Sequence, residues 1–98
     1  MQFCLRWPDG SESSFRLVDG EELIVGRDAD ESQFVLQEPS VSRRHCKLSA
    51  VGDKAWLEDL GSSGGSFVNG ERVQIALLSP GDTIYLGRCE IVVSADPP

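Results

Sequence analysis

Short stretches in which apolar and polar residues alternate follow one another along the whole chain. The alternation is clear in Phe15-Arg16-Leu17 and in Thr83–Leu86, and it is the pattern of a β-strand with one buried face. No stretch repeats apolar residues at the three- and four-residue spacing of an amphipathic helix. The pattern predicts strands at 2–7, 14–18, 22–26, 33–36, 46–51, 54–60, 66–68, 72–73, 83–86 and 90–94.

Turn sequences separate the predicted strands at short intervals. They combine glycine with asparagine, aspartate or proline, the residues that tight turns favour. Many short strands joined by such turns are typical of an all-β antiparallel sandwich or barrel. In these folds binding residues collect in the loops at one end of a rigid scaffold. The longest predicted loops are 27–32, 37–45 and 61–65.

Composition and charge narrow the possible functions. The 98 residues are enough for one domain with a modest core. The formal net charge of −7 argues against a general nucleic-acid binder, which needs a basic face. The apolar runs are too short to cross a membrane, and the first ten residues lack the pattern of a secretory signal. We therefore expect neither a nucleic acid nor a membrane as partner.

The three cysteines, Cys4, Cys46 and Cys89, fit neither a disulfide framework nor a metal site. Their number is odd, and no two of them form a C-x-x-C pair. Each lies in or directly beside a predicted strand, where a free cysteine usually acts as a small buried apolar residue. Free thiols predict a reducing, cytoplasmic setting. His45 is the only histidine, so we expect no metal ion.

Each of the three loops carries a side chain suited to an oxyanion. A phosphate group offers acceptor oxygens and nearly two negative charges at neutral pH, and proteins bind it with guanidinium groups, hydroxyls and main-chain N–H groups. Arg27 follows the strand-ending Gly26, Ser42 and Arg43 lie in the second loop, and Ser63 lies in the glycine-rich third loop. If these loops converge, they form a small positive site on an acidic body.

The sequence fits known enzyme motifs less well than it fits a site for an oxyanion. Residues 61–65 match the G-x-S-x-G sequence of serine hydrolases, but that motif requires a following helix and a histidine later in the chain, whereas His45 comes earlier. The chain has no Gly-Lys pair for a P-loop and no G-x-G-x-x-G fingerprint. We expect no catalytic residue and no cofactor, and we predict that His45 braces its own loop through hydrogen bonds.

Four segments together resemble the forkhead-associated (FHA) domain. They occur in the order and approximate spacing of that family: Gly26-Arg27, Ser42–His45, Asp59–Gly70 and Leu77–Gly87. The resemblance implies a β-sandwich of about eleven strands, whose loops at one end bind phosphothreonine peptides.

The resemblance covers nearly the whole chain and implies one FHA domain at 1–94. The adjacent prolines within 95–98 are typical of the start of a linker. We therefore expect a phosphopeptide-binding module that mediates phosphorylation-dependent contacts between proteins, as part of a larger multidomain protein.

Residue roles follow from the resemblance by position. Arg27 resembles the phosphate-binding arginine of the family, and Ser42 the serine that donates its hydroxyl to a phosphate oxygen. Arg43 resembles the residue that contacts the phosphate or the adjoining peptide, and Ser63 a second hydroxyl donor. His45 matches the histidine that holds the shape of the loop. The residues that match scaffold positions are Gly26, Gly65, Asn69 and Gly70.

Gly64 departs from the family pattern. Where the family usually has an asparagine that grips the peptide main chain, this chain has glycine. The loss of one or two hydrogen bonds, each worth about 0.5–1.5 kcal/mol, predicts weaker peptide binding. It also leaves open an assembly module that binds an unphosphorylated partner. Arg44, expected to contact the peptide, either reads an acidic flanking residue or faces solvent.

Overall fold

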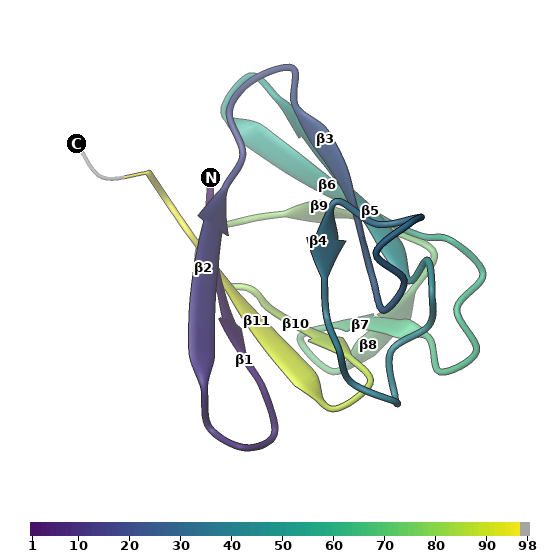
Figure 1. The fold of residues 1–98 in the computed structure, drawn as a ribbon. Helices are drawn as coiled ribbons and strands as arrows, with labels where there is room; N and C mark the ends of the chain where they lie inside the picture. The colour runs from purple at the N-terminus through teal and green to yellow at the C-terminus, as the bar shows by residue number, and fades with distance from the viewer. Residues whose placement is uncertain (97–98) are drawn as a thin grey trace.

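Two β-sheets packed face to face make up the fold of residues 1–96, the part of the chain that the computed structural model describes (Figure 1). These residues form eleven strands and no helix, which confirms the predicted all-β sandwich. The strands are β1 (Gln2–Arg6), β2 (Glu12–Arg16), β3 (Glu22–Gly26), β4 (Phe34–Val35), β5 (Cys46–Val51), β6 (Lys54–Asp59), β7 (Ser66–Val68), β8 (Glu71–Val73), β9 (Ile75–Leu78), β10 (Thr83–Leu86) and β11 (Cys89–Ser94).

One sheet has the strand order β2-β1-β11-β10-β7-β8, and the other has the order β4-β3-β5-β6-β9. Neighbouring strands pair antiparallel, as predicted, except for β3 and β4, which run parallel. β4 is only two residues long, and the loop 27–33 carries the chain back so that β4 pairs alongside the end of β3.

Each predicted strand corresponds to an observed strand, and one observed strand, β9, was not predicted. Four of them match β3, β5, β7 and β10 to the residue, and the boundaries of the others shift by one or two residues. The pattern misses β9, because Ile75-Ala76-Leu77-Leu78 is apolar throughout and shows no alternation. β9 is an edge strand paired with β6, and Ile75 and Leu77 are exposed there.

The hydrophobic core lies between the two sheets, where alternate residues of the strands point inward. Phe3, Ile84 and Ile91 of the first sheet and Leu48 and Leu57 of the second are fully buried. A buried side chain of this kind stabilises a fold by about 1.5–3 kcal/mol relative to leaving it exposed. The core therefore fixes the strands whose ends carry the long loops.

The cysteines are all free thiols, but they differ in burial. Cys46 and Cys89 are buried, as predicted. Cys4 is exposed, so the prediction that it is buried is wrong. The reason is the two-residue period of β1: Phe3 and Leu5 on either side of Cys4 point into the core, and the thiol faces outward.

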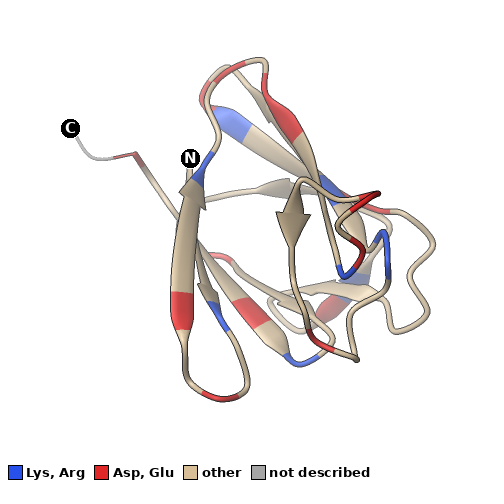
Figure 2. Ribbon diagram, viewed as in Figure 1, with Lys and Arg blue, Asp and Glu red and all other residues tan. Residues whose placement is uncertain are grey.

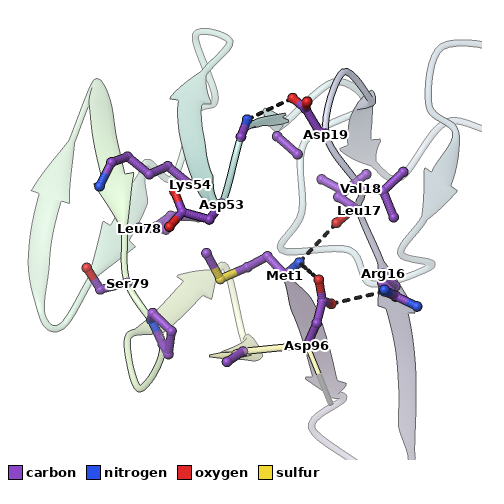
Figure 3. A pocket seen from close by; sticks show the side chains of 14 residues that line it. Met1, Arg16, Leu17, Val18, Asp19, Asp53, Lys54, Leu78, Ser79 and Asp96 are labelled. Atoms are coloured by element: carbon purple, nitrogen blue, oxygen red, sulfur yellow. Dashed lines mark hydrogen bonds and ion pairs between the residues drawn. The ribbon is translucent and has the colours of Figure 1, made fainter. Parts of the chain in front are cut away.

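A pocket of about 610 Å³ lies at the end of the sandwich that holds the β5–β6 turn (Figure 3). Asp96 pairs there with the amino group of Met1 at 3.0 Å and with Nε of Arg16 at 3.0 Å. Asp96 therefore packs against the domain, although it falls in the predicted linker segment 95–98. Residues 97 and 98 of that segment lie outside the described residues.

Candidate functional site

Three loops meet at the other end of the sandwich, because β3, β5 and β6 are neighbours that alternate in direction. β3 and β6 end there, and β5 begins there (Figure 1). The loops are 27–33, 36–45 and 60–65, and together they form a rim. The rim contains all of the residues predicted to contact phosphate.

Ser42 and Ser63 lie side by side on the rim, although they belong to different loops. Their Oγ atoms are 3.3 Å apart, and the main-chain N–H of Ser63 donates a hydrogen bond to Oγ of Ser42 at 3.1 Å. Ser42 is half-buried and Ser63 is exposed, so a ligand can reach both hydroxyls. Two hydroxyls this close can donate to oxygens of a single anion.

Arg27 is held against the same segment by two hydrogen bonds. Its main-chain N–H donates to the carbonyl oxygen of Ser42 at 2.9 Å, and its Nε–H donates to the carbonyl oxygen of Val41 at 2.9 Å. Within residues 1–96 the other guanidinium N–H groups have no acceptor and no carboxylate partner. Arg27, Ser42 and Ser63 are thus brought together, with donors left for a ligand.

Gly26 explains how β3 approaches the second loop. A β-carbon on Gly26 would collide with the carbonyl group of Arg43, so only glycine permits this contact. The same carbonyl oxygen accepts hydrogen bonds from Oγ of Ser32 at 2.8 Å and from the N–H of Asp28 at 3.3 Å. The main chain of Arg43 is therefore anchored, while its side chain is exposed on the rim.

His45 joins the second loop to the third. Its fully buried ring accepts a hydrogen bond at Nδ1 from the N–H of Ser42 at 3.1 Å. Nε2 therefore carries the proton, and it donates to the carbonyl oxygen of Gly65 at 2.8 Å. This geometry supports the predicted bracing role. Because both ring nitrogens are engaged, the ring cannot act as a base toward Ser63.

Asp59 organises the third loop, a role that was not predicted from the sequence. Its carboxylate accepts hydrogen bonds from the N–H groups of Gly61 and Ser62 at 2.9 Å and from Oγ of Ser62 and Ser66 at 2.6 Å. Burial raises the pKa of Asp59, but these hydrogen bonds outweigh that effect and hold the pKa below its ordinary value. The spacing of an aspartate two and three residues before Gly61 and Ser62 is the available sequence signal, since aspartate often caps such a turn.

Ser40 joins the second loop to the β10–β11 turn, a contact that was likewise not predicted from the sequence. Oγ of Ser40 accepts a hydrogen bond from the N–H of Arg88 at 2.9 Å and donates to Glu38 at 3.0 Å. A β-carbon on Gly87 would collide with Ser40. Arg88 also lies 3.6 Å from the Glu38 carboxylate. The contact joins residues far apart in sequence, so no local pattern predicts it.

The two glycines at 64 and 65 differ in their surroundings. Gly64 does not have a positive φ, and a β-carbon there would meet only the carbonyl oxygen of Ser40, at 4.0 Å. Gly65 has a φ of 85°, and a β-carbon there would lie 2.7 Å from Nε of Arg72. Gly65 is therefore required by the fold, whereas Gly64 has room for a side chain.

The side chains of Asn69 and Arg44, two of the predicted site residues, take no part in the hydrogen bonds that join the loops of the rim. The side-chain hydrogen bonds of Asn69 lie outside the rim: the side chain donates to Asp82 at 2.9 Å and accepts from the N–H of Thr83 at 3.0 Å. It has a φ of 52° and, with Gly70, forms the two-residue turn between β7 and β8. Arg44 is exposed on the second loop, and its side chain has no hydrogen bond or ion pair within the described residues.

Basic and acidic segments lie close together along the rim (Figure 2). The first loop places three acidic residues, Asp28, Asp30 and Glu31, next to Arg27. In residues 1–96, the cations with no carboxylate within 4.0 Å are Arg27, Arg43, Arg44, Lys54 and Arg72. All of these except Lys54 belong to the rim or contact it. Unpaired positive charge is thus concentrated at the loop end of an acidic domain.

Neither a metal site nor a membrane-spanning helix is found among the described residues. Within 1–96, no three His, Cys, Asp or Glu side chains gather in a way that could hold a metal ion. No helix of sufficient length and hydrophobicity to cross a membrane occurs in the same range. The rim presents two adjacent hydroxyls and an arginine with unused donors.

Curated proteins of Mycobacterium tuberculosis and Corynebacterium jeikeium are similar to this chain. The FHA domain-containing protein FhaA of Mycobacterium tuberculosis is 43% identical over 89 residues, which is 91% of this chain and 16% of FhaA. An oxoglutarate dehydrogenase inhibitor of Corynebacterium jeikeium is 38% identical over 76 residues, which is 78% of this chain and 52% of the inhibitor. The chain thus spans between about a sixth and about half of the length of these relatives, one of which is named as an inhibitor of an enzyme.

Solved structures of FHA domains and the model of the FHA domain family also match this chain. A structure from a study of phosphothreonine-dependent FHA domain interactions has 40% identity and a TM-score of 0.85, with 100% of both chains covered. The FhaA FHA domain, in complex with the intracellular domain of Rv3910, has 41% identity and a TM-score of 0.80, with 92% of this chain and 97% of that chain covered. The model of the FHA domain family matches residues 23–87. The chain belongs to the FHA domain family.

Proposed function

We propose that this domain binds phosphothreonine-containing segments of a partner protein and catalyses no reaction. Arg27, Ser42 and Ser63 surround the phosphate, and Arg43 assists from the exposed side of the second loop. The observation that carries the proposal is the convergence of these donors: the serine hydroxyls are 3.3 Å apart, and Arg27 is bonded to the main chain of Ser42.

The energetics favour a phosphorylated ligand. A hydrogen bond to a charged group contributes about 1.5–3 kcal/mol, against about 0.5–1.5 kcal/mol for a neutral one. Several donors on one dianion therefore outweigh the neutral peptide contacts that Gly64 cannot make. An aspartate or glutamate in place of the phosphothreonine has fewer oxygens and less charge, so it is a poor substitute.

Two features support a binding role in the cytoplasm. The ring nitrogens of His45 are both committed to main-chain groups, so this histidine cannot activate the rim serines as a base. All three cysteines are free thiols in the fold, which suits a reducing compartment.

An oriented phosphothreonine peptide library, with the same library unphosphorylated, tests the proposal. We expect selection only from the phosphorylated library. Calorimetry with one selected peptide at about pH 7.5 and pH 5.5 extends the test: phosphate loses its second charge below a pKa of about 6, so the affinity falls while the arginines stay charged. Equal binding of both libraries would instead support the assembly module with an unphosphorylated partner, for which Gly64 is the favouring feature.

A further inference from the structure

Arg72 contacts the rim but has no role in the proposed phosphate site. It lies on the edge strand β8, opposite Phe67 of β7. The chain has sixteen Asp and Glu residues against nine Lys and Arg residues, yet Arg72 has no carboxylate within 4.0 Å among residues 1–96. An unpaired arginine in such an acidic domain is free to meet a negative group from outside.

The guanidinium of Arg72 lies over the glycine-rich loop. A β-carbon on Gly65 would be 2.7 Å from Nε and 3.0 Å from Cζ of Arg72. Gly65 itself is held in place, since its N–H donates to Ser62 at 2.9 Å and its carbonyl oxygen accepts from His45 at 2.8 Å. Arg72 therefore rests on a fixed part of the rim, and only a glycine at 65 permits this approach.

Arg72 lies close enough to Ser63 for one peptide to reach both residues. Consecutive Cα atoms are about 3.8 Å apart, so the guanidinium lies within about 12 Å of the Cα of Ser63. An extended peptide covers about 3.3–3.6 Å per residue. A side chain two to four residues from the phosphothreonine can thus reach Arg72.

We propose that Arg72 is a specificity-determining residue that recognises a second negative group on the phosphopeptide, two to four residues from the phosphothreonine. The inference rests on the proposed function. The chemistry of Arg72 suits a carboxylate or a second phosphate, because its planar guanidinium can donate two parallel hydrogen bonds to either. Gly64 makes this contact more important, since the adjoining loop position offers no side-chain grip of its own.

A peptide series provides the test. Fluorescence anisotropy measures Kd for a phosphothreonine peptide with alanine at all flanking positions, for its unphosphorylated form, and for versions with one aspartate at each position up to four residues away on either side. A final set places phosphoserine instead of aspartate, which separates a carboxylate from a second phosphate. Each peptide is titrated into the wild type and into Arg72→Ala, Arg72→Lys and Lys54→Ala.

We expect an aspartate at one or two positions to tighten binding by wild type about three- to tenfold. The gain should vanish in Arg72→Ala, persist in part in Arg72→Lys, and persist fully in Lys54→Ala, whose unpaired cation lies at the far end of β6. The inference is overturned if no acidic position tightens binding, or if the gain survives in Arg72→Ala. If the alanine-flanked phosphopeptide binds no better than its unphosphorylated form, the proposed function fails as well.

Discussion

Nε2 of His45 lies 2.8 Å from the carbonyl oxygen of Gly65, and this buried bond fastens the glycine-rich loop to the second loop. His45→Ala leaves that carbonyl and the N–H of Ser42 without partners, at about 1–3 kcal/mol for each buried group. We expect the free energy of unfolding in urea to fall by about 2–5 kcal/mol, with weaker phosphopeptide binding as a consequence. Ser63→Ala is the control, because it changes an exposed hydroxyl and should alter stability by less than about 0.5 kcal/mol. Equal stability of wild type and His45→Ala would show that the bond does not brace the rim.

Arg27→Ala should abolish most phosphopeptide binding while leaving the fold intact. Its guanidinium is exposed apart from one bond to Val41, so its loss hardly affects the core. Removing one or two charge-assisted hydrogen bonds, each worth about 1.5–3 kcal/mol, weakens binding by a factor of about 10 to about 10⁴. Calorimetry measures the affinity, and thermal unfolding checks the fold. If Arg27→Ala binds the phosphopeptide as tightly as wild type, the assignment of the phosphate position is wrong.

Gly64→Asn should tighten phosphopeptide binding. The position is exposed, lacks a positive φ and has open space around its Cα, so an asparagine can be added without strain. One or two new hydrogen bonds to the peptide main chain correspond to about three- to tenfold higher affinity.

Gly65→Asn is the matched control for Gly64→Asn. It places the same side chain one residue later, where φ is 85° and Arg72 occupies the space. We expect it to destabilise the domain and to bind less tightly. A Gly64→Asn variant with unchanged or weaker affinity would show that the family's asparagine has no equivalent role in this loop.

Asp59→Asn should alter the dependence of stability on pH. The pKa of Asp59 is lower in the folded state than its ordinary value, so the carboxylate stabilises the fold fully above about pH 4, and this contribution is lost as the pH falls through the folded-state pKa. The amide variant cannot accept all of the same hydrogen bonds and should lose about 1–3 kcal/mol at pH 7. Urea unfolding from about pH 7 to pH 2.5 should therefore give converging curves for the two proteins. Parallel curves would contradict the role given to the Asp59 carboxylate.

Thiol reactivity should distinguish the cysteines. Burial raises the pKa of Cys89 to about 11, with the charge of Glu38 adding to the effect, and burial likewise raises the pKa of Cys46. Cys4 is exposed. A disulfide reagent at about pH 8 should modify one thiol in the native protein and all three in urea. Cys4→Ser should remove the native reaction; a fast native reaction that remains would show that the core opens.

The sequence was most informative where a residue's role depends on its own local pattern. Alternation predicted strands such as β5 and β10 to the residue, and glycine and serine in 61–65 indicated a loop for an anion. The resemblance assigned Gly26 to the scaffold, and the structure supplies the reason, since the Arg43 carbonyl occupies the space of a β-carbon. Each of these features depends either on residues that are close together in sequence or on a position that the FHA family shares.

The roles that could not be predicted depend on contacts between distant segments or on a side chain with two possible uses. Ser40 meets Gly87 and Arg88 only because the sheets pack together. Arg72 carries no motif, and its place over Gly65 follows from the pairing of β7 with β8. Asp59 has the spacing of a turn-capping aspartate but could equally have been a surface charge, and its four hydrogen bonds identify it as the centre of the loop.

The second loop is attached on both flanks, to Ser32 and Asp28 through the carbonyl of Arg43 and to Arg88 through Ser40. A ligand therefore meets a preorganised surface, whose conformational entropy was already lost when the domain folded. Association should then proceed at the rate of simple encounter, without a slow rearrangement, and competing peptides should differ mainly in how long each remains bound.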